Sequence, residues 1–434
     1  MSESTKGDVV ITGIGLMTPI GTNLDTFWDN LSEGRHGFSK TEQLDANCTP
    51  GQIAGEVSDF SESAARKTFL KPVRKQVKVM CREIQLGVAA ALEALKDAGI
   101  EAGTITPERI GVEFGANLMS SPPEVMVDSA KACFSDDERR RFEYDKWGVQ
   151  ADSRFAGMEP LWLLKYLPNM PGCHIGIAID ARGPNNSLTQ EEASGGLVIS
   201  EACGIIRRGR ADVMIAGTTG TRLTPVKAGQ HQHWDVLSDG DAATRCRPFD
   251  KSRTGEVVSE SACTLILESR EHAEKRGAKI YGSILATSAT CVLDDESGEQ
   301  KAVELAVAAA LKKAGLCYGD LGHVSACSSG HPVRDAFEAK ALTALQQQST
   351  TKVPVTALKS YMGSAGSGSA LVELAGSLLA VQHGKLPRTL NFSSADDGVD
   401  LPIVTEDGVA PANKVFMKTS VTRMGQCSTV IVGE

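Results

Sequence analysis

The sequence predicts an α/β protein built as two related halves, and three observations lead to this prediction. The chain has 434 residues, which is too long for one ordinary hydrophobic core. Its hydrophobic content is 41% with only 5% aromatic residues, as in proteins built on Val, Ile, Leu and Ala. Short apolar runs of strand length alternate with longer segments that have the apolar spacing of helices, and this order begins again after Glu268.

The first half opens with a predicted strand over residues 9–15, which is apolar and ends in glycines. Its Gly-x-Gly pair lacks the third glycine and the following helix of a dinucleotide-binding motif, so a nucleotide site is not expected. Residues 73–98 have apolar positions every three or four residues and are followed by glycine, which predicts a long helix. A second strand is expected over residues 109–115, and the charged stretch 120–147 is interpreted as helical insertions at the surface.

The stretch from residue 183 to residue 217 predicts a turn, a buried helix and a strand. A Gly-Pro-Asn turn leads into a short polar strand, and residues 193–207 then have the apolar spacing of a buried helix. Arg208 and Gly209 end this helix, and residues 211–216 form an apolar run of strand length. We therefore expect Glu191 and Glu192 to lie at the N-terminus of a buried helix.

The second half repeats this order. Residues 245–268 combine an Arg-Pro-Phe-Asp turn with alternating apolar positions, which predicts a β-hairpin that closes the first half. A helix is expected from Lys301 to Gly315, followed by a short strand over residues 323–326. We divide the chain near residue 268.

The charge of the chain limits its partners. The formal net charge of −9 argues against nucleic acid as a general partner. Two local basic clusters are compatible either with solvated helix faces, the simpler interpretation, or with docking of an acidic carrier protein; they comprise Arg66, Lys67, Lys71, Arg74, Lys75 and Lys78, and Arg139, Arg140 and Arg141.

Cysteine and histidine spacing predicts neither disulfides nor a metal. The 11 cysteines are scattered singly, which fits a reducing cytoplasm. His231 and His233 have strand spacing that would place both on one side, but no third ligand is near, so a loop role beside a cavity entrance is favoured over a metal site. The chain shows no secretion signal and no run of 18 apolar residues, so a cytoplasmic protein without a membrane span is expected.

The stretch 183–217 resembles the nucleophile segment of β-ketoacyl-acyl-carrier-protein synthases, the condensing enzymes of the thiolase superfamily. Further similar segments are Leu167-Pro168-Asn169-Met170, Arg247-Pro248-Phe249-Asp250 and Lys359-Ser360 with Gly363. The resemblance covers nearly the whole chain. It implies a thiolase fold with duplicated halves in an α-β-α-β-α arrangement: residues 1–268, with the nucleophile-position loop and interface insertions, and residues 269–434.

The resemblance also assigns three catalytic positions, and all three are changed. Members of the family use one Cys to hold the acyl group and two His to polarise the malonyl thioester; the corresponding residues here are Glu192, Cys327 and Ser364. A carboxylate cannot store an acyl group as a thioester. Without either imidazole, the decarboxylation intermediate also loses its oxyanion donors, each typically worth about a hundredfold to a thousandfold in rate. Condensation by the usual route is therefore not expected.

Other family positions are retained or altered without direct loss of chemistry. Lys359, Asp335 and Glu338 stand where the family keeps them, and we interpret them mainly as residues that hold loops by ion pairs. Met424 stands where the family has the Phe that gates the acyl channel, with Arg423 beside it.

Three functions follow as hypotheses. The leading one is a ketosynthase-like protein of fatty acid or polyketide biosynthesis that does not condense alone and acts, like a chain-length factor, as partner of an active ketosynthase. The second is an enzyme with altered chemistry on acyl thioesters using Glu192 or Cys327, although Glu192 at a helix N-terminus is expected to be a poor base and Cys327 has only His331 nearby. The third is a non-catalytic acyl-binding homodimer.

The expected partners follow from the same resemblance. They are an acyl carrier protein, whose phosphopantetheine arm would be the ligand, and a second ketosynthase-fold chain in a homodimer or heterodimer. No cofactor of the protein's own is expected.

Overall fold

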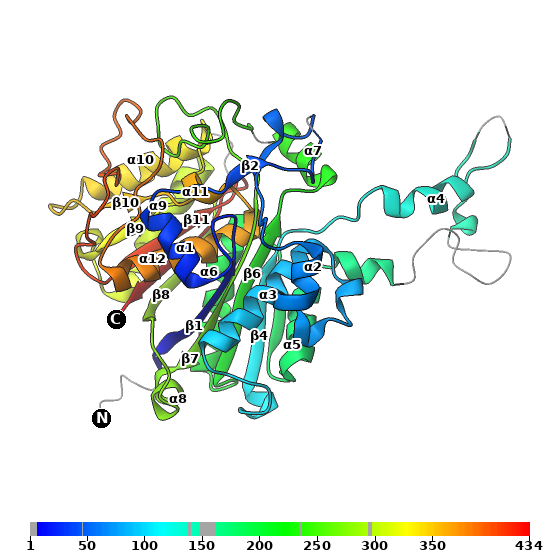
Figure 1. The fold of residues 1–434 in the computed structure, drawn as a ribbon. Helices are drawn as coiled ribbons and strands as arrows, with labels where there is room; N and C mark the ends of the chain where they lie inside the picture. The colour runs from blue at the N-terminus through cyan, green and yellow to red at the C-terminus, as the bar shows by residue number, and fades with distance from the viewer. Residues whose placement is uncertain (1–6, 46, 138–139, 148–160, 235, 294–296) are drawn as a thin grey trace.

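Ten strands in one sheet order form the centre of the molecule. The computed structural model describes residues 7–45, 47–137, 140–147, 161–234, 236–293 and 297–434 (Figure 1). The strand order is β10-β9-β11-β12-β8-β1-β7-β6-β4-β5. The strands are β1 (Val9–Met17), β4 (Ile110–Ala116), β5 (Asn185–Leu188), β6 (Val213–Thr221), β7 (Glu260–Ser269), β8 (Gly282–Cys291), β9 (His323–Ser325), β10 (Val355–Thr356), β11 (Phe416–Val421) and β12 (Gln426–Gly433). A separate small sheet pairs β2 (Phe38–Lys40) with β3 (Ile53–Gly55).

The strand order shows an internal duplication. From β1 the sheet continues antiparallel to β7, antiparallel to β6, then parallel to β4 and β5. From β8 the same pattern runs through β12, β11, β9 and β10. Within the sheet, the two sets are joined where β1 pairs with β8, Val10 with Ser283 and Ile11 with Gly282. This confirms the predicted fold class, while the division into domains 1–268 and 269–434 stays a prediction.

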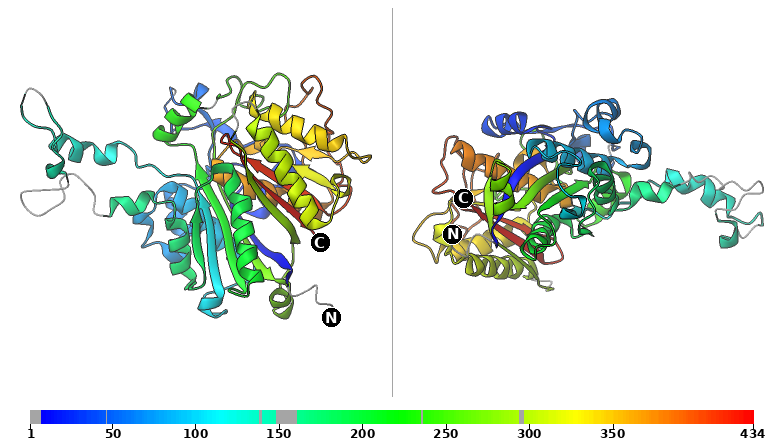
Figure 2. Two further views of the ribbon diagram at one scale, coloured as in Figure 1. Left: turned by 180° about the vertical axis from the view of Figure 1, so that it is seen from behind. Right: turned by 90° about the horizontal axis from the view of Figure 1, so that it is seen from below.

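Helices cover both faces of each set of strands, in five layers (Figures 1 and 2). One outer layer holds α3 (Arg82–Asp97) and α5 (Met170–Ile179) against the first strands; the other holds α9 (Gly298–Ala314) and α10 (Arg334–Gln346) against the second. Between the two sets lie α6 (Ser194–Arg207) and α12 (Ser369–His383), which share one apolar core. No helix among the described residues is long and apolar enough to cross a membrane.

Small residues allow the central helices to pack closely, and this packing positions the start of α6. A Cβ added at Gly195 would lie 2.7 Å from the Ala370 Cβ on α12. A Cβ added at Gly15 of β1 would lie 2.1 Å from the Ala90 carbonyl oxygen of α3. The glycine that resembled part of a nucleotide motif therefore serves close contact between a helix and a strand.

Three local predictions are wrong. The helix predicted over residues 73–98 begins only at Arg82, because residues 71–79 form short 3₁₀ turns around Pro72 and Cys81 is extended. The segment expected to be a hairpin contributes one long strand, β7, which lies between β1 and β6 and is buried on both faces. His231 and His233 lie in helix α7 (Pro225–Trp234), not in a strand, so they do not face the same side.

The described residues of the charged stretch 120–147, which are 120–137 and 140–147, belong to an arm that extends from the body (Figures 1 and 2). Its helix, α4 (Glu124–Ala132), has only Ser129 buried, as expected for a surface insertion. Beyond it, Phe134 and Phe142 pack edge to face at 5.5 Å. Arg139 of the second basic cluster lies outside the described residues.

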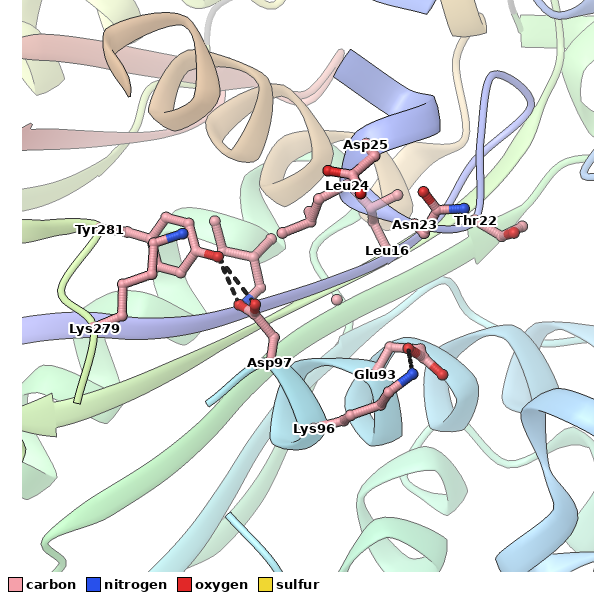
Figure 3. Close-up of a pocket in the computed structure, with 12 residues that line it drawn as sticks. Leu16, Thr22, Asn23, Leu24, Asp25, Glu93, Lys96, Asp97, Lys279 and Tyr281 are labelled. Carbon is pink, nitrogen blue, oxygen red and sulfur yellow. Dashed lines mark hydrogen bonds and ion pairs between the residues drawn. The ribbon is translucent and has the colours of Figure 1, made fainter. Parts of the chain in front are cut away.

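A broad hollow of about 460 Å³ lies where β1, α1 (Leu24–Ser32), the end of α3 and the start of β8 meet (Figure 3). The Asp97 carboxylate accepts hydrogen bonds from the Tyr281 hydroxyl at 2.9 Å and from the Ile14 amide at 2.8 Å. Lys96 points to Glu93 on the same helix at 3.4 Å. These polar groups satisfy one another and tie α3 to the sheet, and none of the predicted site residues lines the hollow.

The remaining helices are short: α2 (Glu62–Ala64), α8 (Arg270–Lys275) and α11 (Lys359–Met362).

His323 on β9 predicts a loss of stability in acid. It is fully buried, stacks on Phe416 with ring centroids 5.0 Å apart, and neither ring nitrogen has a hydrogen-bond partner among the described residues. Burial lowers the pKa of His323 to about 3. Below pH 6.5 the unfolded chain therefore binds a proton that the folded chain does not, so stability falls as the pH falls through this window.

At pH 4.5 this difference costs on the order of 3 kcal/mol. We expect His323→Phe to lose less free energy of unfolding than the wild type between pH 7.5 and pH 4.5, measured by urea denaturation. His383, which stacks on Trp28 but is exposed, provides the control His383→Phe, which should follow the wild type. Equal pH dependence in all three proteins would contradict the prediction.

Candidate functional site

The three positions predicted to be catalytic converge at the edge of the central layer. Glu192 lies in the 3₁₀ turn Glu191–Ala193 that leads into α6. Glu191 has φ +43°, in the left-handed region that favours glycine, so the chain turns sharply just before Glu192. Cys327 follows β9, and Ser364 follows α11. All three side chains are buried.

Glu192 is neutralised by an arginine that the sequence analysis did not consider. Arg222, one residue after β6, places its Nη2 2.6 Å from Glu192 Oε1, and both side chains are about 5% exposed. Burial alone would raise the pKa of Glu192, but Arg222 and, more weakly, Arg334 outweigh it and hold the pKa below its ordinary value. The carboxylate is ionised, as predicted, although the main cause is the ion pair and not the helix N-terminus.

The same arginine also binds the third position. Arg222 Nη1 donates a hydrogen bond to Ser364 Oγ at 2.7 Å and lies 2.9 Å from Glu256 Oε2. One guanidinium therefore joins Glu192 to Ser364. Ser364 Oγ uses one of its two lone pairs to accept this hydrogen bond, which ties the side chain to Arg222.

The charges continue with alternating sign into the second half of the chain. Glu256 also accepts a hydrogen bond from Ser329 Oγ at 2.7 Å and lies 3.3 Å from Arg334 Nη1. Arg334 Nε in turn lies 3.3 Å from Glu299 Oε2. Because Glu192, Arg222 and Glu256 precede residue 268 and the others follow it, this chain of ion pairs joins the two halves.

Cys327 is enclosed by a different set of partners. Its amide donates to Glu338 Oε1 at 2.9 Å, its carbonyl oxygen accepts from Lys359 Nζ at 2.6 Å, and its Sγ lies 3.5 Å from the same Nζ. Burial raises the pKa of the Cys327 thiol, although Lys359 and Lys418 act in the opposite direction. The thiol is therefore held in its protonated, weakly nucleophilic form.

The retained residues hold the loops, partly in a different way from that predicted. Glu338 binds the Cys327 amide, Ser328 Oγ at 2.7 Å and Thr419 Oγ1 at 2.7 Å. Asp335 accepts from three backbone amides, those of Phe249, Ser329 and Gly330, at 2.9–3.0 Å. Both acids act through hydrogen bonds to the loop and not through ion pairs.

Lys359 does form an ion pair. Its Nζ lies 2.7 Å from Glu373 Oε1, and Lys418 Nζ lies 2.6 Å from Glu373 Oε2, all buried. Glu373 belongs to α12, so this triad fixes the Cys327 loop to the central layer.

A small cavity of about 100 Å³ opens beside Glu192. Its floor includes Glu192, Arg222 and Arg334, and its walls include Lys227 and His231 of α7; Arg423 and Met424 lie at its rim, with Met424 56% exposed. Cys327 and Ser364 are not among the described residues that line it. The structure therefore brings the predicted gate residues next to Glu192 but separates Cys327 from the cavity.

Metal chemistry finds no support in this arrangement. No group of three or more His, Cys, Asp or Glu side chains in the described ranges is placed to hold a metal ion.

The sequence analysis missed Arg222, Glu256, Arg334 and Glu299. One signal was available: a carboxylate predicted to be buried at position 192 requires a partner of opposite charge, because an unpaired buried charge is costly. Arg222 lies directly after the Thr and Gly residues that end β6, and Glu256 directly precedes Val257 and Val258, so each was a charged residue beside a segment expected to be buried.

Comparisons with known proteins agree with this fold. The family model for the beta-ketoacyl synthase N-terminal domain matches residues 6–273, and that for the C-terminal domain matches residues 278–393. A 3-oxoacyl-[acyl-carrier-protein] synthase 2 from Staphylococcus aureus (strain COL) is 30% identical over 412 residues, which is 94% of this chain and 93% of the relative.

Two solved structures share the fold at lower identity. The ishigamide ketosynthase/chain length factor has a TM-score of 0.83 and 22% identity, with 99% of each chain covered. A type II PKS acyl-carrier protein in complex with its ketosynthase bound to the hexaketide has a TM-score of 0.78 and 22% identity, again with 99% of each chain covered. The matched models span most of the chain, and the chain therefore belongs to the beta-ketoacyl synthase family.

Proposed function

We propose that this ketosynthase-like chain does not condense acyl groups itself and serves as the non-catalytic partner of an active ketosynthase in fatty acid or polyketide biosynthesis. One observation supports this more than any other: the carboxylate of Glu192, at the position predicted for the acyl-carrying Cys, is ionised and paired with Arg222 at 2.6 Å. Attack of a carboxylate on a thioester is uphill, and a carboxylate already bound to a guanidinium is a still weaker nucleophile.

The other two positions also lack the donors that decarboxylation needs. Ser364 already accepts a hydrogen bond from Arg222, and Cys327 carries a thiol whose pKa is raised by burial. A thiol is only a weak hydrogen-bond donor, and Ser364 does not line the cavity beside Glu192 among the described residues, so neither replaces an imidazole donor to a developing oxyanion.

The hypothesis of an altered enzyme has weaker support. A nucleophilic Cys327 would need a thiolate and a path to the substrate, whereas its pKa is raised and it does not line the cavity among the described residues. Glu192 as a general acid would need a raised pKa, and the opposite shift is found. An acyl-binding homodimer would need a larger pocket than the 100 Å³ beside Glu192.

A second chain of the same fold is supported by the surface around α5 and the arm. β5 has a neighbouring strand on one side only in the described part of the sheet, so its other edge is open to pairing. Exposed large apolar side chains lie just after β4, on the arm, on the segment before α5 and on α5 itself: Leu118, Phe134, Tyr144, Leu161, Leu163 and Ile177. The similarity in fold to a ketosynthase/chain length factor favours a heterodimer with an active chain over a homodimer.

The basic cluster of residues 66–78 supports a carrier protein as the other partner. Its side chains are all exposed, and Arg66 forms an ion pair with Glu62 at 3.1 Å; the members are Arg66, Lys67, Lys71, Arg74, Lys75 and Lys78. On a chain with net charge −9, such a cluster offers a local field for an acidic protein.

The first prediction of the proposed function concerns turnover and partnership. We expect the isolated chain to form no 3-oxoacyl product from acyl- and malonyl-carrier protein above a no-protein control, because no residue at the three positions can carry the acyl group or stabilise the enolate. Co-expressed with a sequence-distinct ketosynthase that retains Cys and both His, the chain should co-purify as a heterodimer by native mass spectrometry. Turnover by the isolated chain would contradict the proposal. A stable homodimer that forms no complex with the active ketosynthase would also contradict it.

The second prediction concerns carrier docking. The triple change Lys71→Glu, Arg74→Glu and Lys75→Glu should weaken binding of an acyl carrier protein about tenfold or more at low salt, with a smaller difference at high salt. Isothermal titration calorimetry at two salt concentrations measures this.

The matched control changes the same net charge at exposed lysines elsewhere: Lys275→Glu, Lys301→Glu and Lys312→Glu. Equal losses of affinity in the two triple variants would mean that net charge, and not this cluster, governs binding, and the docking proposal would fail.

A further inference from the structure

Arg222 and Arg334 occupy the space in which a substrate would have to lie. A group that reacts at position 192 must approach within about 3–3.5 Å of the side chain there. Arg222 Nη2 already lies 2.6 Å from Glu192 Oε1, and Nη1 of the same guanidinium lies 2.7 Å from Ser364 Oγ. The first and third positions are therefore bridged by one planar group.

Arg334 takes up the space beside the second position. Its Nη2 donates to the Val421 carbonyl oxygen at 3.0 Å, the same oxygen that lies 3.7 Å from Cys327 Sγ. The two guanidiniums share Glu256, which is 2% exposed and held in place by Ser329 Oγ at 2.7 Å. Two arginines thus lie across all three positions, fixed by a common carboxylate.

The volume that remains is too small for a thioester arm. The cavity beside Glu192 measures about 100 Å³, whereas pockets that bury a ligand of pantetheine size occupy roughly 300–1,000 Å³. Moving Arg222 aside would break its contacts with Glu192, Glu256 and Ser364 together, remove the direct ion-pair partner of the buried Glu192, and leave Glu256 with Arg334 alone.

We infer that Arg222 and Arg334 form a plug that closes the site to acyl thioesters independently of the residue at position 192. The inference deepens the proposed function and rests on it only for the assignment of the three positions. It implies that restoring a Cys at 192 leaves the site closed, because Glu256 and Ser364 still hold Arg222 when Glu192 is removed. Loss of the catalytic residues and loss of access are then two separate barriers to condensation.

The test places a thiol at position 192 and measures its access directly. Glu192→Cys is prepared alone and with Arg222→Ala, and each protein is treated with iodoacetamide and with a pantetheine-linked maleimide. Peptide mass spectrometry quantifies alkylation of residue 192 over time, with labelling of the unfolded chain as the full-reaction reference. Labelling reports access, not turnover or partner binding, so this inference and the proposed function can fail separately.

We expect Cys at position 192 to react about tenfold faster or more with both reagents once Arg222 is removed. Arg276, a partly buried arginine after α8 whose Nε lies 2.8 Å from Glu268 Oε2, provides the control: Glu192→Cys with Arg276→Ala should label as slowly as Glu192→Cys alone. Equal rates with and without Arg222, whether fast or slow, would overturn the inference, as would equal acceleration by Arg276→Ala. If Arg222→Ala does not fold, Arg222→Gln serves instead. Gln fills much of the space of Arg222 with a polar side chain but lacks the guanidinium, so it should give a smaller acceleration in the same direction.

Discussion

The ion pair between Glu192 and Arg222 is the interaction on which the rest of the site depends. Two buried charges are tolerated only where each is compensated, and removal of one partner from such a pair typically costs about 3–5 kcal/mol. Here the compensation continues through Glu256 to Arg334 and Glu299, so each of the three central members has an opposite charge on either side. The series crosses from the first half of the chain to the second at the point where the family's reaction site is predicted to lie.

The scaffold around this series is that of the family, whereas the three positions that the resemblance assigns to catalysis carry Glu192, Cys327 and Ser364. The loop that carries Cys327 is fixed to the central helix α12 by the triad of Lys359, Glu373 and Lys418. Glu338 and Asp335 accept hydrogen bonds from three backbone amides of the same loop, those of Cys327, Ser329 and Gly330. These contacts hold the loop in place whether or not the protein binds a substrate or catalyses a reaction. A fold can therefore be preserved in detail while its site takes on a different role, and function has to be argued from the site.

Much of the architecture could be predicted because buried strands and helices leave periodic apolar patterns. The helix expected over residues 193–207 is α6 (Ser194–Arg207). The strand expected over residues 211–216 is β6, which begins two residues later and ends five residues later. The restart of the element order corresponds to the repeated strand order. The start of α3 was misplaced because apolar residues of a 3₁₀ segment around Pro72 continue the helical spacing by chance. β7 was misread as a hairpin because alternating apolar positions do not show where a chain reverses, and β7 instead runs straight between β1 and β6.

The candidate site was predictable at the positions aligned with family motifs and not beyond them. Glu192, Cys327 and Ser364 were found by spacing from conserved turns of the family, and their burial agrees with a place inside the fold. The side chains that neutralise Glu192 are Arg222, 30 residues further along the chain, and Arg334 in the second half, so no local pattern joins them. Long-range pairing of charges is a property of the folded chain.

The most direct test of this account is whether the chain can hold an acyl group at all. Intact-protein mass spectrometry after incubation with acyl- and malonyl-carrier protein measures this for the wild type and for Cys327→Ala. The account predicts no stable mass increase in either protein, because Glu192 is bound to Arg222 and the Cys327 thiol is buried and protonated. A stable acyl adduct on the wild type that is lost in Cys327→Ala would contradict it and would establish a relocated nucleophile.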